Sequence, residues 1–295
     1  MGKNPIQVFL GVDGGGSNTR ALLIDQNGDR ISEGKSFGSN PHNGGYPQAA
    51  SNINEAVQTA LETAAPAQLK IESAFCGIAG IRNTEEQELL AKELQHFPWA
   101  QSVSLEINHD VSIAYAAVLG TEPGITLICG TGSSCLGKDL SGKTILTSGR
   151  TEIIDDPGSG YAIGLEAIEA GLVQELSNSR SDIAKLAPKV ITLALNGMPA
   201  AQNILNGNAD SLVKLIQETH SQIKLGDAFN LGIIGGLGSA DTLYLKILLK
   251  KVLSAFPDAA ISFTRNTPVE AAAQLALEQF NRSVYRTCLA NTSNS

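Results

Sequence analysis

The sequence is poor in cysteine and in aromatic residues. It has four cysteines and one tryptophan in 295 residues, and aromatic residues make up 5% of the chain. No two cysteines form a Cys-x-x-Cys pair. Three of the four lie in or beside apolar runs, where a free cysteine behaves as a small hydrophobic residue. This usage predicts a reducing compartment and no disulfide bonds.

Long apolar runs are absent as well. None approaches the ~18 residues that a membrane-spanning helix requires. Residues 1–7 also lack the apolar stretch of a signal peptide. We therefore expect a cytoplasmic protein with no membrane partner.

Basic residues are scarce, with 21 Lys and Arg against 29 Asp and Glu, which gives a formal net charge of -8. This balance argues against a nucleic-acid partner, because a phosphate backbone requires a net basic face. It is compatible with a phosphorylated small molecule, since a few dipoles and a metal ion suffice to hold one.

Glycine, in contrast, is abundant. The chain has 30 glycines, above the usual share of ~7%. Hydrophobic residues make up 42% and charged residues 17%, an ordinary globular composition. The length is comfortable for two hydrophobic cores.

The chain begins with a pattern that it repeats. The apolar run Val8–Val12 leads through a glycine turn to the apolar run Ala21–Ile24, an order typical of a β-hairpin. The same order returns about 115 residues later, where Ile125–Cys129 is followed by the glycine turn Gly130–Ser134. A repeat on this scale predicts two related α/β domains in tandem.

The remaining elements follow from hydrophobic periodicity. Thr84 and Gln87 have the spacing of a capping box, and residues 38–47 are expected to form a loop. The spacing predicts helices over 48–65, 84–95, 111–119, 161–178, 181–196, 199–207, 209–225, 240–255 and 270–285. It predicts further strands over 31–35, 71–79, 103–108, 143–147, 230–234 and 260–264.

Both glycine turns are candidates for phosphate binding. Backbone amides approach phosphate oxygens closely only where side chains are missing. The first turn adds the carboxylate of Asp13, which could hold Mg²⁺ directly or through water. An ordinary glycine turn is the alternative in each case, but two turns in register between repeats favour phosphate binding.

A third segment, Gly137–Thr144, matches the G-x-x-x-x-G-K-[ST] phosphate-loop pattern. A working phosphate loop joins a strand to a helix, whose first amides face the phosphates. Here the β-branched residues after Lys143 predict a strand instead. We therefore interpret this segment as a hairpin turn with a surface lysine.

Three further segments carry candidate polar groups. Asp110 lies between a predicted strand and a predicted helix, and its position favours a helix cap over a general base or a metal ligand. Asp155 and Asp156 precede a helix and are either sugar or metal ligands or an acidic capping loop. The glycines of 235–238 would let a flat ring or a phosphate lie close, but they lack the dinucleotide-binding spacing.

In this order, the motifs resemble those of the sugar kinase and actin-like ATPase superfamily, and more narrowly the BadF/BadG/BcrA/BcrD ATPase family. The resemblance extends from about residue 9 to residue 280. It implies an α/β fold of two tandem ribonuclease-H-like domains, 1–118 and 119–295, with a cleft between them. The C-terminal helix is expected to pack back on the first domain.

The resemblance also implies a role for each motif. Asp110 would be the catalytic aspartate, and Asp13 would hold the metal. The implied ATP-binding residues are Asp13, Gly14, Gly15, Gly16, Ser17, Asn18 and Thr19 in the first turn, Gly130, Thr131, Gly132 and Ser133 in the second, and Gly235 and Gly236. The implied sugar-binding residues are Asn40, Asp110, Thr131, Gly149 and Asp156.

The chain departs from the family pattern at a few positions. Ser17 stands where the family uses threonine, and Ala271 replaces the glycine of the closing P-x-x-G-A segment. Arg150 stands where N-acetylglucosamine kinases of the family carry tryptophan, and no acid follows Asp156 because Pro157 comes next. These two features resemble the bacterial glucosamine kinases more.

The resemblance therefore predicts an ATP- and Mg²⁺-dependent kinase that phosphorylates the 6-hydroxyl of an amino sugar, in a chain that could form a homodimer. The alternatives are an activator ATPase of a 2-hydroxyacyl-CoA dehydratase, which would need cysteines for an iron–sulfur cluster, and a sugar-sensing regulator without catalysis.

Overall fold

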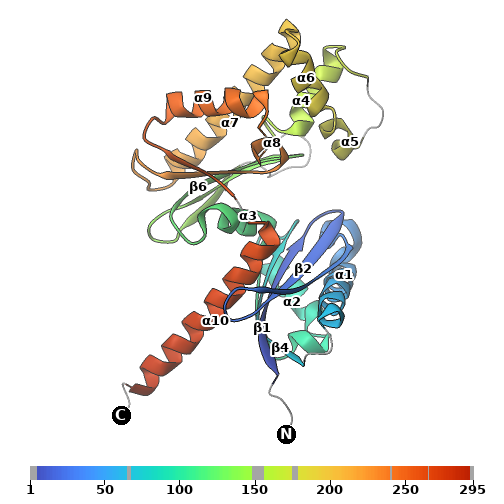
Figure 1. Cartoon of the computed structure of the whole chain (residues 1–295), viewed down its shortest axis with the longest axis vertical. Coiled ribbons are helices and arrows are strands. Elements are labelled where there is room, and N and C mark those ends of the chain that lie inside the picture. Colours follow the sequence, from blue (N-terminus) through green and yellow to red (C-terminus); the bar gives the residue numbers. More distant parts are fainter. Residues whose placement is uncertain are drawn as a thin grey trace. The chain divides into compact units, whose positions relative to one another are not determined.

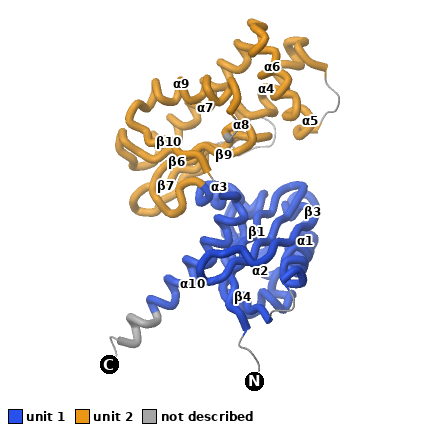
Figure 2. The backbone as a smooth tube through the Cα atoms, in the orientation of Figure 1, with its two compact units in different colours: residues 1–117, 266–295 blue, residues 118–265 orange. Residues whose placement is uncertain are grey.

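The computed structural model describes residues 5–64, 68–147, 156–174, 179–239, 241–264 and 266–292. The chain divides into two compact units (Figure 2). Unit 1 comprises residues 1–117 and 266–295, and unit 2 comprises residues 118–265. The chain therefore leaves unit 1 and returns to it.

Unit 1 is built on a five-stranded sheet in the order β3-β2-β1-β4-β5. The strands are β1 (Ile6–Gly14), β2 (Asn18–Ile24), β3 (Arg30–Phe37), β4 (Leu69–Ile78) and β5 (Ser104–His109). The first three are antiparallel neighbours, whereas β1, β4 and β5 run parallel. The carboxyl ends of these three parallel strands therefore meet at one edge of the sheet.

Helices cover both faces of this sheet (Figure 1). They are α1 (Pro41–Thr63), α2 (Thr84–Leu94), α3 (Asp110–Leu119) and α10 (Pro268–Thr292), with a short 3-10 turn at Pro98–Ala100. Alternation along β1 explains the two faces, because Val8 and Leu10 join a core with α1, while Phe9 joins one with α3 and α10.

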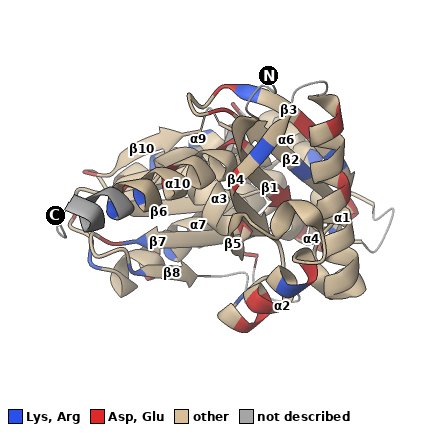
Figure 3. Ribbon diagram, turned by 90° about the horizontal axis from the view of Figure 1, so that it is seen from below, with Lys and Arg blue, Asp and Glu red and all other residues tan. Residues whose placement is uncertain are grey.

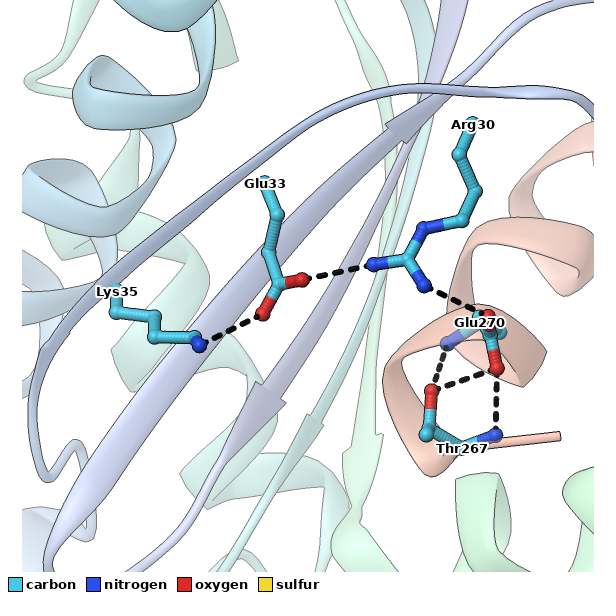
Figure 4. A network of polar contacts seen from close by, with 5 residues as sticks. All are labelled: Arg30, Glu33, Lys35, Thr267 and Glu270. Atoms are coloured by element: carbon cyan, nitrogen blue, oxygen red, sulfur yellow. Dashed lines mark hydrogen bonds and ion pairs between the residues drawn. The ribbon is translucent and has the colours of Figure 1, made fainter.

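The last helix belongs to unit 1 although it is far from it in sequence. A Cβ atom on Gly11 of β1 would lie 2.5 Å from the carbonyl oxygen of Val269, so α10 crosses the strand in direct backbone contact. At the start of α10, Thr267 and Glu270 form a capping box with reciprocal hydrogen bonds (Figure 4). Arg30 of β3 joins this box through an ion pair with Glu270 at 3.1 Å.

Unit 2 repeats the topology of unit 1. Its strands are β6 (Gly124–Cys129), β7 (Ser133–Lys138), β8 (Thr144–Thr147), β9 (Asn230–Ile234) and β10 (Ala260–Phe263), in the order β10-β9-β6-β7-β8. The antiparallel set β6-β7-β8 corresponds to β1-β2-β3, and the parallel neighbours β9 and β10 correspond to β4 and β5. The sequence repeat is thus a repeat of topology, and the α/β fold class is confirmed.

The helices of unit 2 depart most from the expected boundaries. They are α4 (Gly160–Glu169), α5 (Arg180–Ala184), α6 (Ala187–Leu195), α7 (Pro199–Gln222), α8 (Gly236–Ser239) and α9 (Leu243–Ala255). The helix predicted over 161–178 ends at Glu169, because Gly171 takes a left-handed φ of 67°. The helix predicted over 181–196 is two helices, since Pro188 starts a new one.

Three other expectations were wrong. The two helices predicted over 199–225 are one, α7, because Gly207 and Asn208 do not interrupt it. The expected loop 38–47 contains the first turns of α1, which are kinked at Gly45. The cap of α2 is Asn83, whose side chain accepts from the Glu86 amide, one residue before the predicted box.

Acidic and basic residues are interspersed along the ribbon in Figure 3, for example along α2. Among the described residues, no helix combines the length and the apolar character needed to cross a membrane.

Candidate functional site

The first glycine turn closes the β1–β2 hairpin. The Gly15 amide donates to the Asn18 carbonyl at 2.8 Å. The carbonyls of the turn are used by neighbouring loops, because Ser39 donates its amide to Gly15 at 3.0 Å and Ala79 donates to Gly14 at 2.7 Å. The turn is therefore held firmly by its carbonyls.

Two of its glycines have no structural need to be glycine. A Cβ atom on Gly15 or on Gly16 would meet its nearest neighbour at 3.4 or 3.8 Å, which is ordinary contact. Neither residue has a left-handed backbone. The missing side chains instead leave the turn open to a ligand that approaches its amides.

The hydroxyls of the first turn differ in position. Ser17 and Asn18 are exposed, whereas Thr19 is fully buried. The Thr19 hydroxyl donates to the Phe37 carbonyl at 2.7 Å and lies 2.9 Å from the Ser39 hydroxyl. Thr19 therefore supports the hairpin from within, and Ser17 presents its side chain at the surface.

Two carboxylates lie near one another at the carboxyl edge of the unit 1 sheet. Asp13 is the next-to-last residue of β1, and Asp110 follows β5 as the first residue of α3. Burial and, after it, the charge of Asp110 raise the pKa of Asp13 from 3.8 to about 6, although Arg20 acts to lower it. Burial also raises the pKa of Asp110, whose Oδ1 accepts from the Val111 amide at 3.0 Å.

The cap of α3 is a histidine. The Nδ1 atom of His109 accepts from the Ser112 amide at 3.1 Å, which is the bond of an N-cap to the third helical residue. Burial lowers the pKa of His109, which keeps Nδ1 free to accept. The cap role that position alone favoured for Asp110 was wrong, so the Asp110 carboxylate keeps acceptor sites for another partner.

The second glycine turn, in unit 2, is joined to the start of α4. Gly130 donates its amide to the Gly132 carbonyl at 2.9 Å and closes the turn. The amides of Gly160 and Tyr161 donate to the carbonyls of Gly130 and Thr131 at 2.8 and 3.1 Å. The turn and the helix start therefore form one hydrogen-bonded unit.

Asp156 lies against this second turn. Its Oδ1 accepts from the Ser133 amide at 2.7 Å, and its Oδ2 forms an ion pair with Arg180 of α5. The Arg180 guanidinium also stacks over the Tyr161 ring at 4.3 Å from the centroid. The sequence offered no signal for Arg180, because it lies far from Asp156 in the chain and outside any motif.

The glycines after β9 lie beside the same turn. A Cβ atom on Gly130 would be 3.9 Å from the Gly236 amide nitrogen. Gly235 must be glycine, because its φ is 110° and a Cβ atom would lie 2.7 Å from the carbonyl carbon of Cys129. Gly236 has open space around it and begins α8. Unit 2 thus brings together the second turn, Asp156 and the Gly235–Gly236 turn.

The comparisons with known proteins agree with this pattern. The profile of the BadF/BadG/BcrA/BcrD ATPase family matches residues 10–273, which is most of the chain. The chain belongs to this family.

The chain is also similar to proteins whose names state a sugar kinase activity. It is 26% identical to an N-acetyl-D-glucosamine kinase of Dictyostelium discoideum, over 92% of this chain and 98% of the relative. It is 32% identical to a glucosamine kinase of Vibrio cholerae, over 57% of this chain and 55% of the relative. A Chromobacterium violaceum protein provisionally named an N-acetylglucosamine kinase shares the fold, with a TM-score of 0.70 at 19% identity, over 92% of this chain and 99% of that one.

Other residues predicted from the family pattern are less informative here. Asn40 caps α1, and its Oδ1 accepts from the His42 amide at 2.9 Å. Gly149 and Arg150 lie outside the described residues.

The segment that matches the phosphate-loop pattern, Gly137–Thr144, lies in the β7–β8 hairpin. The Asp139 carboxylate accepts from the Ser141 and Lys143 amides there, at 2.9 and 3.0 Å. The hairpin prediction is confirmed.

Proposed function

We propose that this chain is an ATP-dependent kinase that phosphorylates the 6-hydroxyl of an amino sugar, glucosamine or N-acetylglucosamine. The family and the named relatives support the reaction class. The observation that carries the proposal is the pair Asp13 and Asp110, which interact electrostatically at the edge of the unit 1 sheet beside an open glycine turn.

Asp110 has the properties of the group that orients and deprotonates the sugar hydroxyl. Its helix is capped by His109, so one of its oxygens is not needed for the fold. Its burial raises the carboxyl pKa, which makes the carboxylate a better proton acceptor. Phosphoryl transfer passes through a loose transition state, so positioning and charge neutralisation matter more than base strength.

The backbone amides of the two glycine turns, Gly14–Gly16 and Gly130–Gly132, would hold the phosphates of ATP, and the Gly235–Gly236 turn would lie beside the nucleoside. Asn40, Thr131, Gly149 and Asp156 would contact the sugar. The ion pair with Arg180 would hold the Asp156 carboxylate in one orientation before the sugar binds, so that it could accept a hydrogen bond from the sugar without rearranging.

The residues present fit a magnesium ion. Within the described residues no cluster of three or more His, Cys, Asp or Glu side chains could hold a metal. Mg²⁺ does not need such a cluster, because it is usually held by one or two carboxylates and substrate phosphates. Asp13 would hold it, because burial and then the charge of Asp110 raise the pKa of Asp13, and a cation beside the two carboxylates would offset both effects. When bound, the ion would neutralise charge on the phosphates.

No observation on the described residues favours the activator alternative. A cluster-binding cysteine must be reachable as a thiolate. Cys76, Cys129 and Cys135 are fully buried, and burial raises the pKa of each to about 12.

The variant Asp110→Asn tests the proposed role of Asp110. We expect kcat to fall by about 10²–10⁴-fold, the usual contribution of a positioned acid–base group. ATP affinity, measured by calorimetry, should stay within about twofold because the glycine turns are intact. The matched control is Asp210→Asn, which removes an exposed carboxylate on α7 and should leave kcat unchanged. Near-normal turnover by Asp110→Asn would refute the assignment.

An ADP-release assay with magnesium ATP identifies the substrate. Glucosamine, N-acetylglucosamine, N-acetylmuramic acid and glucose are compared at equal concentrations. The proposal expects sugar-dependent ADP release with an amino sugar and mass-spectrometric detection of its 6-phosphate. ADP release that does not depend on any sugar would contradict the kinase proposal.

A further inference from the structure

A buried tyrosine on α9 contacts the loop that carries Asp156. The Tyr244 side chain is fully buried, and its hydroxyl donates to the Gly158 carbonyl at 2.6 Å. Tyr244 lies on the first turn of α9, shortly after the Gly235–Gly236 turn and α8. One side chain therefore links the proposed nucleotide side of unit 2 to the proposed sugar loop.

Gly158 has little freedom to move. Its φ is 74°, and a Cβ atom on it would lie 2.5 Å from the Asn208 carbonyl oxygen. Its carbonyl accepts from the Tyr244 hydroxyl and, more weakly, from the Cys129 thiol at 3.6 Å. Both donors are buried, so this carbonyl depends on the protein for its hydrogen bonds.

The loop 156–160 is attached to the second glycine turn on its other side. The Ser133 hydroxyl donates to the Pro157 carbonyl at 2.8 Å, and the Ser133 amide donates to Asp156. The loop is thus held between Ser133 on one side and Tyr244 on the other. A displacement at Gly158 moves the peptides on which the direction of the Asp156 carboxylate depends.

We propose that Tyr244 is a positioning residue of the kinase reaction. Its hydroxyl fixes the Gly158 carbonyl and thereby sets the loop 156–160, and with it Asp156, against the second glycine turn. This inference rests on the proposed function for its kinetic consequence, but its structural part does not. Tyr244 acts through the loop and contacts neither substrate.

The variant Tyr244→Phe tests the inference, because it keeps the ring that packs in the core and removes only the hydroxyl. It leaves the Gly158 carbonyl with the weak thiol donor alone, and an under-satisfied buried acceptor drives the loop to rearrange. We expect the KM for the sugar to rise by about tenfold, whereas the KM for ATP changes less than about twofold.

The matched control is Thr219→Val. Thr219 is also fully buried in unit 2, and its hydroxyl donates to Leu215 within α7 at 2.9 Å, away from the loop. Both variants lose one buried hydroxyl, and thermal melting measures the loss of stability in each. If the sugar KM follows stability in both variants, Tyr244 has only a structural role and the proposal is overturned.

Amide hydrogen exchange supplies a second measurement that needs no catalysis. The amides of Gly160 and Tyr161 donate to the second turn, and their exchange reports the attachment of the loop. We expect their exchange to accelerate by about tenfold in Tyr244→Phe but not in Thr219→Val.

Together, the sugar KM and the amide exchange rate distinguish a failure of this inference from a failure of the proposed function. Unchanged exchange in Tyr244→Phe overturns the inference whatever the enzyme does. Faster exchange with an unchanged sugar KM overturns the positioning role. Faster exchange in a protein whose wild type phosphorylates no sugar retains the structural link and rejects the proposed function instead.

Discussion

At the scale of single residues, the proposed active site is a place where the fold loses stability. Asp13 and Asp110 are both partly buried, and burial raises the pKa of each. A carboxyl whose pKa is higher in the folded than in the unfolded chain binds protons more tightly when folded, so its ionisation opposes folding. Such groups are typical of functional sites, where charge is kept for a ligand.

The variant Asp13→Asn measures this cost. The pKa of Asp13 rises from 3.8 to about 6 on folding, so its unfavourable contribution grows as the pH rises through this window and is complete above it. We expect Asp13→Asn to raise Tm by about 3 °C at pH 7.5 without nucleotide. The gain should shrink as the pH falls from 6 toward 4. A variant less stable than the wild type at pH 7.5 would contradict the assigned environment.

The neighbouring charge can be tested separately. The Asp110 charge raises the pKa of Asp13, so Asp110→Asn should lower that pKa below about 6, although burial will still hold it above 3.8. Carbon-detected NMR titration of the Asp13 carboxyl measures the shift. An unchanged value would mean that the two carboxylates do not interact.

The sequence could indicate Asp13 as chemically active, because it lies at the end of an apolar run beside a glycine turn. The position of Asp110 alone favoured a helix cap, and only the family resemblance indicated a catalytic role for it. The sequence could not indicate that His109 caps α3, since histidine is not a preferred cap and the bond depends on how the ring lies over the helix start. It could not indicate Arg180 or Tyr244 either, because these residues reach the site through tertiary contacts alone. Their roles, like those of the other site residues, stay predictions.

At the scale of elements, the first glycine turn combines a rigid scaffold with an open surface. Its carbonyls bond to Ser39 and Ala79, while Gly15 and Gly16 face space that a side chain could fill. Packing does not require these two glycines. A ligand that needs close approach to the amides does require them.

This contrast predicts opposite outcomes for two glycine substitutions. Gly15→Ala should leave Tm within about 1 °C, yet weaken the binding of magnesium ATP by about tenfold or more, because the methyl group occupies the approach to the amides. Gly207→Ala is the control. It lies within α7 with no atom near its Cβ position, so it should raise stability by about 0.5–1 kcal/mol without affecting ATP. Calorimetry and melting curves measure both, and normal ATP affinity in Gly15→Ala would argue against phosphate binding at this turn.

Strands were more predictable than helices for a physical reason. The hairpins β1–β2 and β6–β7 are bounded by glycine turns, which punctuate the apolar pattern clearly. The helix ends depend on weaker signals. The two segments predicted over 199–225 join as α7 because tertiary packing of residues such as Leu205 and Leu212 outweighs the low helix propensity of Gly207 and Asn208.

At the scale of the whole molecule, the two units have different connectivity. The core of unit 2 is formed by residues that all lie between 118 and 265. Unit 1 is discontinuous, because one of its cores combines Phe9 and Phe75 with Val269 and Leu277 of α10. The repeated hairpin indicated two related α/β units, and the order of the motifs indicated the family; the α/β fold class and the family are confirmed. The repeat could not show how tightly α10 meets Gly11.

This difference in connectivity predicts which part of the chain folds alone. A protein of residues 118–265 contains a complete sheet and core, so it should be soluble and melt cooperatively, as followed by circular dichroism. A protein of residues 1–117 lacks α10 and exposes the apolar face that includes Phe9 and Ile113, so it should aggregate. Joining residues 266–292 to it through a flexible linker should restore a folded unit 1, whereas the same linked segment carrying Leu277→Asp should not. A stable fragment 1–117 would mean that α10 contributes little to unit 1.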